Sequence, residues 1–467
     1  MVEKQKDIKK VFILTIPFSG HVDPVIQIGK ELTNERKVKT VIYSTENYKN
    51  KIEKSGAEFR NYDGVIWQEM IFKLPFNKRV SLTSQLIEKE QHIIENNLKK
   101  LAIDIKNEKP NLILYEFQSI YAKYVVRFLN DNYYDSNSSM PSILLFSTSF
   151  IFDKTFYPNE YENNSGTMAR QDVLKETKIR LKSYQMSKKL NISYKDPFKE
   201  IFEIDSRLEN IVFTFPELQP RSHLFNKNNK FVGSCICTDE EIYYEEDDYI
   251  QKLIDPYFKT FPENTSKNDL NNSNKNKLVL VSLGEMFGDN IQLYLTVINA
   301  FKINIDDNQL LNEQSTNLET ISLFIIVSVG EKCFSIFNDM LTNNELKLAN
   351  NMLVVPFISQ IQVLKRASLF ITQSDIISIH KSIAYGVPMI CIPLTSDQLK
   401  IAYRVTTDLG LGITLDFLNL KSNEIRYEIM NILQDSSYNE RCIRYSKISA
   451  EYDSQKNSAD IIEGYLI

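Results

Sequence analysis

The sequence predicts an α/β protein of two domains, each built on a parallel sheet between layers of helices. Strand patterns alternate with helix patterns along both halves of the chain, which is typical of parallel sheets. A length of 467 residues suits two or three domains, each with its own core. A polar stretch rich in Asp and Glu separates the two halves. We therefore expect two Rossmann-like domains that face each other across a cleft.

The first half contains short apolar runs that we predict as buried strands: Val11–Ile16, Thr40–Ser44, Leu112–Tyr115 and Ser142–Phe146. After the first run, Asp23 and Pro24 predict a helix with the aspartate as N-cap and the proline as its first residue. A second helix is expected to end near Gly56. The charged, amphipathic stretch Gln171–Phe202 predicts helices that pack on the sheet or cover a pocket.

The second half repeats this pattern, with predicted strands at Leu278–Leu283, Ser322–Val329, Met352–Val355, Leu369–Thr372 and Pro388–Ile392. Before it, the acidic run Asp239–Asp248 and the polar run Asn264–Lys277 have the composition of a linker. The predicted boundaries are 1–234 for the N-terminal domain, 235–277 for the linker, 278–440 for the C-terminal domain and 441–467 for a C-terminal helix.

Composition excludes several classes of protein. The chain has 55 Lys and Arg against 60 Asp and Glu, a net charge of −5, so it lacks the basic excess of a nucleic-acid-binding protein. Its five cysteines are scattered without metal-ligand spacing, which favours a reducing cytoplasm and no metal. Cys235 and Cys237 are either incidental thiols or a redox or metal pair, and we favour incidental thiols. No apolar run approaches the ~18 residues of a transmembrane segment, and the N-terminal run is too short for a signal peptide.

The turn after the first strand carries a candidate catalytic base. A dinucleotide-binding fold would place G-x-G-x-x-G here, and the chain has Ser19, Gly20 and His21 instead. This is the carboxyl edge of the sheet, where open α/β folds bind ligands. Imidazole has an ordinary pKa suited to removing a proton near neutral pH. His21 is therefore either a catalytic base or a histidine that caps or packs the first helix.

A second candidate, Glu116, ends the strand at Leu112–Tyr115. Its carboxylate would emerge at the same sheet edge as His21 and could accept the second ring N–H of the imidazole. Such a contact fixes the tautomer and stabilises the imidazolium that forms when a proton is taken. The alternative is a solvated loop acid.

The motifs that carry chemistry are spread along the chain: Phe18–Pro24, Val281–Gly284, Val355–Gln360, Leu369–Thr372, Tyr385–Gln398 and Leu409–Gly412. In order and spacing they resemble the GT-B, family 1 glycosyltransferases, especially the macrolide-type bacterial branch. These enzymes transfer a sugar from a nucleotide donor to small acceptors. The turn Phe18–Pro24 resembles the catalytic-histidine turn of that family, and the other segments resemble its donor-binding signature.

The resemblance implies a GT-B fold in which residues 1–234 bind the acceptor, residues 278–440 bind the nucleotide sugar, and the tail 441–467 packs back on the N-terminal domain. It implies that His21 deprotonates the acceptor. Glu116 stands where the family usually has an aspartate, and its longer side chain changes the orientation of the pair.

For the donor, the resemblance implies that Phe357 lies against the base, that Gln360 bonds the edge of the base, and that Asp397 and Gln398 hold sugar hydroxyls. A flat, apolar ring suits stacking. The alternative for these residues is ordinary core packing together with a loop acid. The remaining residues of the predicted donor site are Gly284, Gln373 and Ser378.

The departures from the family gather at the diphosphate site. Gln373-Ser374-Asp375 replaces the family's His-Gly-Gly or His-Cys-Gly at a helix N-terminus, and Ile377 replaces an asparagine. Lys381 replaces an acid that binds ribose hydroxyls, and Glu285 replaces a small hydroxyl residue. Because a helix N-terminus attracts phosphate, Asp375 and Glu285 would compete with the donor. We expect a weakened diphosphate site, in which Lys381 or a divalent cation offsets part of the repulsion.

Two functions follow from this sequence. The first is a UDP-glycosyltransferase-like hexosyltransferase that moves a sugar from a nucleotide-diphosphate donor, UDP-linked, to a small lipophilic acceptor by inverting displacement, without a further cofactor. The second is a non-catalytic protein of the same fold that binds a hydrophobic ligand or a partner protein. Two features stay open. Trp67 and Phe72–Phe76 line an acceptor pocket or fill a core, and His380 and Lys381 reach the cleft or lie on an exposed helix face.

Overall fold

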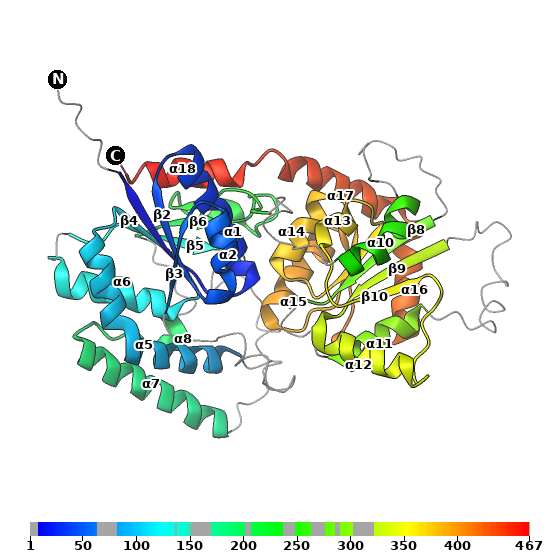
Figure 1. Ribbon diagram of the computed structural model, residues 1–467, viewed down its shortest axis with the longest axis horizontal. Coiled ribbons are helices and arrows are strands. Elements are labelled where there is room, and N and C mark those ends of the chain that lie inside the picture. Colours follow the sequence, from blue (N-terminus) through cyan, green and yellow to red (C-terminus); the bar gives the residue numbers. More distant parts are fainter. Residues whose placement is uncertain are drawn as a thin grey trace. The chain divides into compact units, whose positions relative to one another are not determined.

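A computed structural model describes residues 8–62, 82–135, 138–148, 150, 170–200, 207–236, 248–261, 263, 276–284, 290–301 and 322–466. The chain divides into two compact units, each with its own sheet (Figure 1). Unit 1 consists of residues 1–242 and 452–467, and unit 2 consists of residues 243–451.

Unit 1 contains a seven-stranded sheet in the order β3-β2-β1-β4-β5-β6-β7, with every neighbouring pair parallel. Its strands are β1 (Lys10–Leu14), β2 (Lys39–Ser44), β3 (Glu58–Asn61), β4 (Leu112–Glu116), β5 (Ser142–Phe146), β6 (Glu209–Val212) and β7 (Asn229–Phe231). The strand order reverses between β1 and β4. In open α/β sheets, ligands bind outside the carboxyl ends of the strands at such a switch point.

Helices cover both faces of this sheet because successive side chains of a strand point to opposite faces. Phe12 and Leu14 pack toward α5 (Leu82–Glu108) and α6 (Ile120–Tyr133), whereas Val11 and Ile13 pack toward α1 (Ser19–Lys30) and α18 (Ser454–Glu463). Helix α7 (Arg170–Leu190) lies on α5, outside the sheet layers (Figure 1). The shorter helices of unit 1 are η1 (Glu31–Glu35), η2 (Glu46–Tyr48), α2 (Lys49–Lys54), α8 (Pro197–Glu200) and η3 (Ser222–Leu224).

Helix α1 begins earlier than the sequence indicated. The prediction of an N-cap at Asp23 is wrong, because Phe18 is the N-cap and Pro24 lies inside the helix. The carbonyl of Phe18 accepts hydrogen bonds from the backbone N–H groups of His21 and Val22, at 2.9 Å each. The first turn therefore forms one turn before Asp23, and it places His21 on the helix rather than in the loop.

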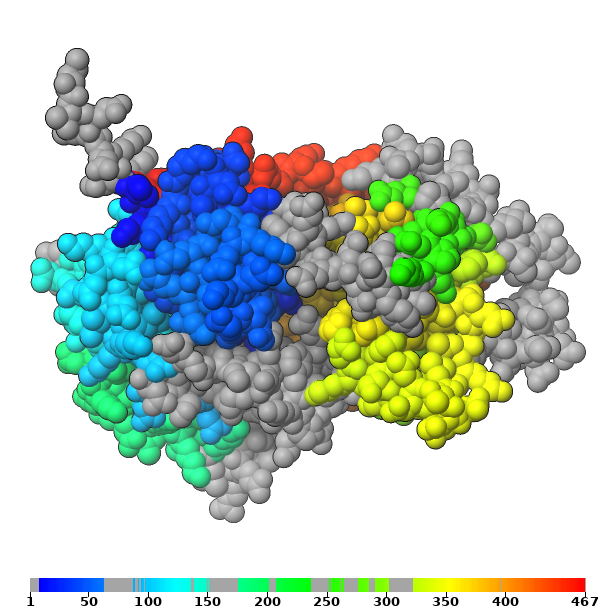
Figure 2. Space-filling model, viewed as in Figure 1, coloured from blue at the N-terminus to red at the C-terminus, as the bar shows by residue number. Residues whose placement is uncertain are grey.

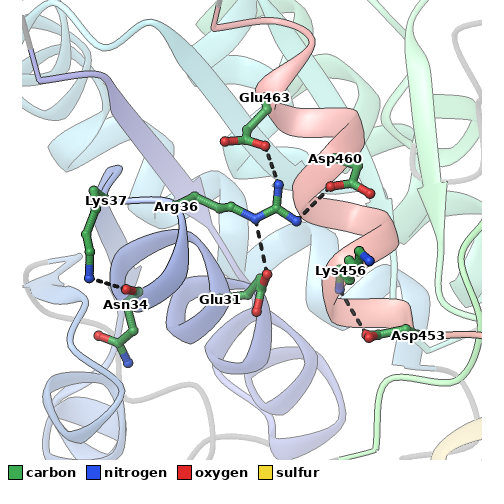
Figure 3. Close-up of polar contacts among 8 residues, drawn as sticks. All are labelled: Glu31, Asn34, Arg36, Lys37, Asp453, Lys456, Asp460 and Glu463. Carbon is green, nitrogen blue, oxygen red and sulfur yellow. Dashed lines mark hydrogen bonds and ion pairs between the residues drawn. The ribbon is translucent and has the colours of Figure 1, made fainter.

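The C-terminal helix α18 belongs to unit 1, where an arginine at the end of η1 binds it. Arg36 pairs with Glu31 on its own segment at 3.2 Å and with Asp460 on α18 at 2.7 Å, and it also bonds Glu463 (Figure 3). These carboxylates hold the pKa of the guanidinium above its ordinary value. Figure 2 shows the red C-terminal residues on the surface beside the blue start of the chain.

Unit 2 contains a six-stranded sheet in the order β10-β9-β8-β11-β12-β13, again parallel throughout. Its strands are β8 (Asn276–Ser282), β9 (Ser322–Ser328), β10 (Met352–Val355), β11 (Leu369–Thr372), β12 (Met389–Cys391) and β13 (Gly412–Thr414). The order reverses between β8 and β11, so this sheet also has a switch point. The predicted α/β class with parallel sheets is confirmed in both halves.

The helices of unit 2 connect these strands, with α11 packed on α16 and α14 packed on α17. They are α10 (Asp248–Thr260), α11 (Ile291–Ala300), α12 (Gly330–Thr342), α13 (Gln360–Leu364), α14 (Ile376–Ala384), α15 (Ser396–Tyr403), η5 (Arg404–Asp408), η6 (Phe417–Asn419), α16 (Ser422–Gln434) and α17 (Ser436–Ser449).

Two ranges differ from the sequence prediction in their internal structure. The range 235–277, predicted as a linker, contains α10, whose Tyr257 packs edge-on against Phe324 of β9, as does Phe261 just after it. The tail 441–467 contains not one helix but the end of α17, which belongs to unit 2, and α18, which belongs to unit 1. Within the part of the chain that the structure describes, no helix is long and apolar enough to span a membrane.

Candidate functional site

Three polar side chains meet at the switch point of unit 1. Glu116 is the last residue of β4, Ser147 directly follows β5, and His21 lies in the first turn of α1 after β1. These strands are neighbours in the order β1-β4-β5, so their carboxyl ends lie side by side. The parallel register aligns Glu116 with Leu145, which places Ser147 just beyond the end of β4. The fold thereby gathers residues 21, 116 and 147 into one cluster.

The cluster is a chain of close polar contacts. The Ser147 hydroxyl donates to Glu116 Oε1 at 2.7 Å, and Ser147 Oγ lies 3.2 Å from His21 Nδ1. His21 Nδ1 also lies 3.4 Å from Glu116 Oε2. Because an ionised carboxylate can only accept, the hydroxyl proton of Ser147 points to Glu116. The hydrogen bond between Ser147 Oγ and His21 Nδ1 depends on the tautomer of the imidazole; in the Nδ1–H tautomer, Nε2 carries no proton.

Burial distinguishes the cluster from a surface ion pair. Glu116 is fully buried, Ser147 is 1% exposed and His21 is 9% exposed. The alternative of a solvated loop acid at Glu116 is therefore wrong. A buried carboxylate needs hydrogen-bond or charged partners. Within the described residues, Ser147 donates to Oε1, whereas Oε2 accepts no hydrogen bond and lies 3.4 Å from His21 Nδ1. When the imidazole takes up a proton, the carboxylate is in place to stabilise the positive charge.

In unit 2, the switch point brings Gly284 after β8 against Gln373 after β11. Gly284 has φ +72°, and a Cβ at this position would lie 1.8 Å from Gln373 Nε2. Glycine therefore meets both the backbone conformation and the close approach of the amide. Gln373 is 5% exposed, and its Oε1 has no hydrogen-bond partner within the described residues. A buried acceptor without a partner is rare in native proteins and is a natural point for a ligand to bind.

A second polar chain begins at the same sheet edge. Gln360, the first residue of α13, donates through Nε2 to Ser282 Oγ at 3.0 Å. Lys381 of α14 donates through Nζ to Gln360 Oε1 at 3.1 Å. Both ends of the Gln360 amide are thus engaged, and the half-buried ammonium of Lys381 is held beside it. The arrangement places a positive charge where the family resemblance implies an acid.

Asp375 occupies the N-terminus of α14, the position predicted to bind diphosphate. It is the N-cap of the helix, and its Oδ1 accepts from the backbone N–H of Ser378 at 2.9 Å. The carboxylate therefore takes up one of the free N–H groups and neutralises part of the positive helix end. Ser378 itself is 3% exposed.

The other predicted donor residues differ in exposure. Phe357 is 46% exposed and Asp397 is exposed, so both have surface free for a ligand. Gln398 is buried, and its Oε1 accepts from the backbone N–H groups of Leu394 at 2.8 Å and Thr395 at 3.2 Å as part of a capping box for α15. The carbonyl oxygen of Gln398 is thus engaged within the protein, so the sugar contact predicted for this residue would have to use its amide nitrogen.

Several further residues can now be placed. His380 is buried, which contradicts an exposed helix face, and burial lowers the pKa of its imidazole to about 3. Cys235, Cys333, Cys391 and Cys442 are buried free thiols. The described residues contain no cluster of His, Cys, Asp or Glu able to hold a metal ion. Glu285, Trp67, Phe72–Phe76 and Cys237 lie outside the described residues.

Sequence reasoning missed Ser147. The available signal was its place directly after the strand Ser142–Phe146, next to the strand that ends in Glu116. Strand order was needed to use that signal, because only adjacent parallel strands bring the two side chains together.

Comparison with known proteins agrees with this architecture. Residues 332–454 match the family model described as UDP-glucoronosyl and UDP-glucosyl transferase. The chain is 22% identical to the uncharacterized UDP-glucosyltransferase YojK of Bacillus subtilis, over 97% of this chain and 96% of that protein. It is 23% identical to the NDP-glycosyltransferase YjiC of Bacillus licheniformis, over 98% of each chain.

Among solved structures, the calicheamicin glycosyltransferase CalG4 superposes with a TM-score of 0.69 at 18% identity, covering 99% of each chain. The two parallel α/β units and this similarity define a protein of the GT-B class, with two Rossmann-like domains. Within that class, the sequence is similar to the UDP-glycosyltransferases, both in the family-model match at residues 332–454 and in the full-length likeness to YojK and YjiC.

Proposed function

We propose that the protein is an active glycosyltransferase that moves a sugar from a nucleotide-diphosphate donor to a small, lipophilic acceptor with inversion. The observation that carries the proposal is the buried cluster of His21, Glu116 and Ser147 at the switch point of unit 1. It places an imidazole beside a buried carboxylate, the pairing that stabilises a general base once it has taken up a proton.

The proposed reaction begins when Nε2 of His21 removes the proton from an acceptor hydroxyl. The acceptor oxygen then forms a bond to the anomeric carbon of the donor, while the bond between that carbon and the diphosphate oxygen breaks. The nucleoside diphosphate leaves with the electron pair, and the proton stays on His21 as imidazolium beside Glu116. The nucleotide sugar is a co-substrate, and the scheme uses no cofactor.

A UDP-linked donor is supported by the names of the relatives, a UDP-glucosyltransferase and an NDP-glycosyltransferase. The partnerless Oε1 of buried Gln373 supports a ligand at unit 2, and the Lys381 ammonium supplies positive charge for an anionic one. The structural relative CalG4 is named as a calicheamicin glycosyltransferase, and this name supports a small-molecule acceptor. Buried free thiols support a cytoplasmic location.

Asp375 favours a second candidate function. Its carboxylate caps α14 through the N–H of Ser378, which leaves less of the helix end for a diphosphate. A non-catalytic protein that binds a hydrophobic ligand or a partner protein needs no diphosphate site, so this residue is compatible with such a role.

Calorimetric titration separates the two functions. UDP, UDP-glucose and TDP are titrated into the full chain up to about millimolar concentration, and a panel of hydroxylated aromatic acceptors is then incubated with each donor that binds. We expect heat with at least one nucleotide and a glycosylated product detected by mass spectrometry. An absence of heat with every nucleotide would overturn the enzyme function and leave the binding protein.

A further inference from the structure

The contacts of Ser147 suggest a role for a residue that the family resemblance does not mark. The direct contact between His21 Nδ1 and Glu116 Oε2 is 3.4 Å, longer than the 2.7–2.9 Å of a good charge-assisted hydrogen bond. The path through Ser147 is shorter at each step, with 3.2 Å from Nδ1 to Oγ and 2.7 Å from Oγ to Oε1. The hydroxyl therefore makes the better connection between the imidazole and the carboxylate.

The direction of this connection follows from the donors available. An ionised carboxylate has no proton to give, so Ser147 donates to Glu116 and accepts from His21. A serine held in this orientation favours the Nδ1–H tautomer of His21. It disfavours the Nε2–H tautomer, because the unprotonated Nδ1 would then compete with Glu116 for the hydroxyl proton of Ser147.

Burial and backbone position hold the hydroxyl in place. Ser147 and Glu116 are 1% and 0% exposed, so water does not readily replace the contact. The N–H of Phe117 bonds the carbonyl of Leu145 at 3.0 Å, which ties the end of β4 to the end of β5. Ser147 lies two residues beyond that bond, and its distance from Glu116 is thereby fixed by the sheet.

We propose that Ser147 is a positioning residue that relays the Glu116 carboxylate to His21 and sets the Nδ1–H tautomer of the imidazole. The hydroxyl spans the gap that the direct contact leaves. The catalytic part of this inference rests on the proposed function, whereas the tautomer assignment does not.

The test is nitrogen NMR of the histidine side chains in the full chain, labelled with ¹⁵N-histidine and measured at about pH 8, where an ordinary histidine is neutral. The chain has four histidines, and the signals of His21 are assigned by their loss in His21→Ala. We expect the Nδ1–H pattern for His21 in the wild type and a mixture of tautomers in Ser147→Ala. Ser147→Thr, which keeps the hydroxyl, should restore the wild-type pattern.

Thr148→Ala is the matched control. Thr148 is the next residue, and its hydroxyl bonds Gln118 at 3.3 Å rather than the cluster, so this variant should leave the His21 signals unchanged. An Nε2–H pattern in the wild type would overturn the inference without any variant. An unchanged Nδ1–H pattern in Ser147→Ala would also overturn it, because Glu116 alone would then set the tautomer.

Activity gives a second readout. Ser147→Ala should lower kcat about tenfold or more with KM values for donor and acceptor within about twofold, and Ser147→Thr should recover most of the loss. If the wild type is active and Ser147→Ala keeps the same kcat, the proposed relay through Ser147 is overturned and the proposed function stays intact. A wild type that transfers no sugar would overturn the proposed function, while the NMR pattern still decides the assignment of the tautomer.

Discussion

The N-cap of α14 offers a direct way to strengthen donor binding. Replacing Asp375 with glycine removes a negative charge at the proposed diphosphate site and frees the Ser378 N–H that its Oδ1 accepts at 2.9 Å. Glycine is itself a tolerated N-cap, so the exchange lowers the free energy of unfolding by only a few tenths of a kcal/mol. Affinity can therefore be measured on a folded variant.

The expected gain follows from the charge that is removed. A carboxylate about 4 Å from a phosphate contributes roughly 1 kcal/mol of repulsion in water and roughly 4 kcal/mol at the effective dielectric near a protein surface. The N–H that is freed adds a hydrogen bond to the phosphate. Together these effects predict at least a fivefold tighter Kd for a nucleoside diphosphate, since ~1 kcal/mol corresponds to about that factor.

Calorimetry with UDP on wild type and Asp375→Gly measures this difference. Asp435→Gly is the matched control, because it makes the same exchange at another N-cap of the same unit: Asp435 caps α17 and accepts from the backbone N–H of Ser437 at 2.9 Å. Helix α17 contacts the C-terminal side of α14, where Asn439 donates to the carbonyl of Gly386. Asp435→Gly should therefore leave the affinity for UDP unchanged. Unchanged or weaker UDP binding by Asp375→Gly would refute the idea that Asp375 opposes the donor.

Three further predictions concern stability. Arg36→Met removes the ion pairs to η1 and α18. In urea unfolding it should lower the free energy of unfolding of unit 1 by about 1–2 kcal/mol in dilute buffer and by less in high salt, because salt screens charges. Equal losses at both salt concentrations would contradict this prediction. Gly412→Ala places a Cβ 1.9 Å from the Met389 carbonyl oxygen and should lower the free energy of unfolding by about 2–4 kcal/mol. In Gly464→Ala the nearest atom to the new Cβ is 3.2 Å away, and the free energy of unfolding should stay within about 1 kcal/mol of wild type. Equal melting temperatures for the two variants would contradict the packing at Gly412. Burial lowers the pKa of His380 to about 3, so between about pH 6.5 and pH 3 the unfolded chain binds a proton that the native state does not bind. The free energy of unfolding should therefore decrease as the pH is lowered through this range, by up to ~1.4 kcal/mol per pH unit. In urea unfolding, His380→Gln should remove this part of the pH dependence.

Most of the fold was predictable because buried parallel strands are nearly continuous apolar runs. Ser142–Phe146, Met352–Val355 and Leu369–Thr372 were predicted with the bounds they have as β5, β10 and β11. The strand Glu58–Asn61 was not, since its four residues are mostly polar and it pairs only with β2 at the edge of the sheet. Such a strand is specified by its neighbour rather than by its own pattern.

Capping was harder to predict than strands. Asp23-Pro24 has the pattern of a helix start, yet Phe18 caps α1, because the chain turns at the end of β1 before that dipeptide is reached. Asp375 shows the reverse case, since a residue noted only as a charge near phosphate is also a structural N-cap. Local sequence does not distinguish these cases, because caps depend on where the preceding strand ends.

The candidate site was partly accessible from the sequence. His21 and Glu116 could be placed at one sheet edge from strand ends alone, and the distance of 3.4 Å between their side chains needed coordinates. Ser147 and the Lys381–Gln360–Ser282 chain needed the strand order and the helix positions as well. Roles for these residues remain predictions.

The most direct test of whether His21 accepts the proton in sugar transfer compares wild type with His21→Ala. The acceptor-dependent release of nucleoside diphosphate and the affinity for the donor are measured on both. We predict release by the wild type, a loss of about a hundredfold or more in His21→Ala, and donor Kd values that agree within about twofold. Turnover retained in His21→Ala at undiminished donor binding would contradict the assignment of His21 as the base.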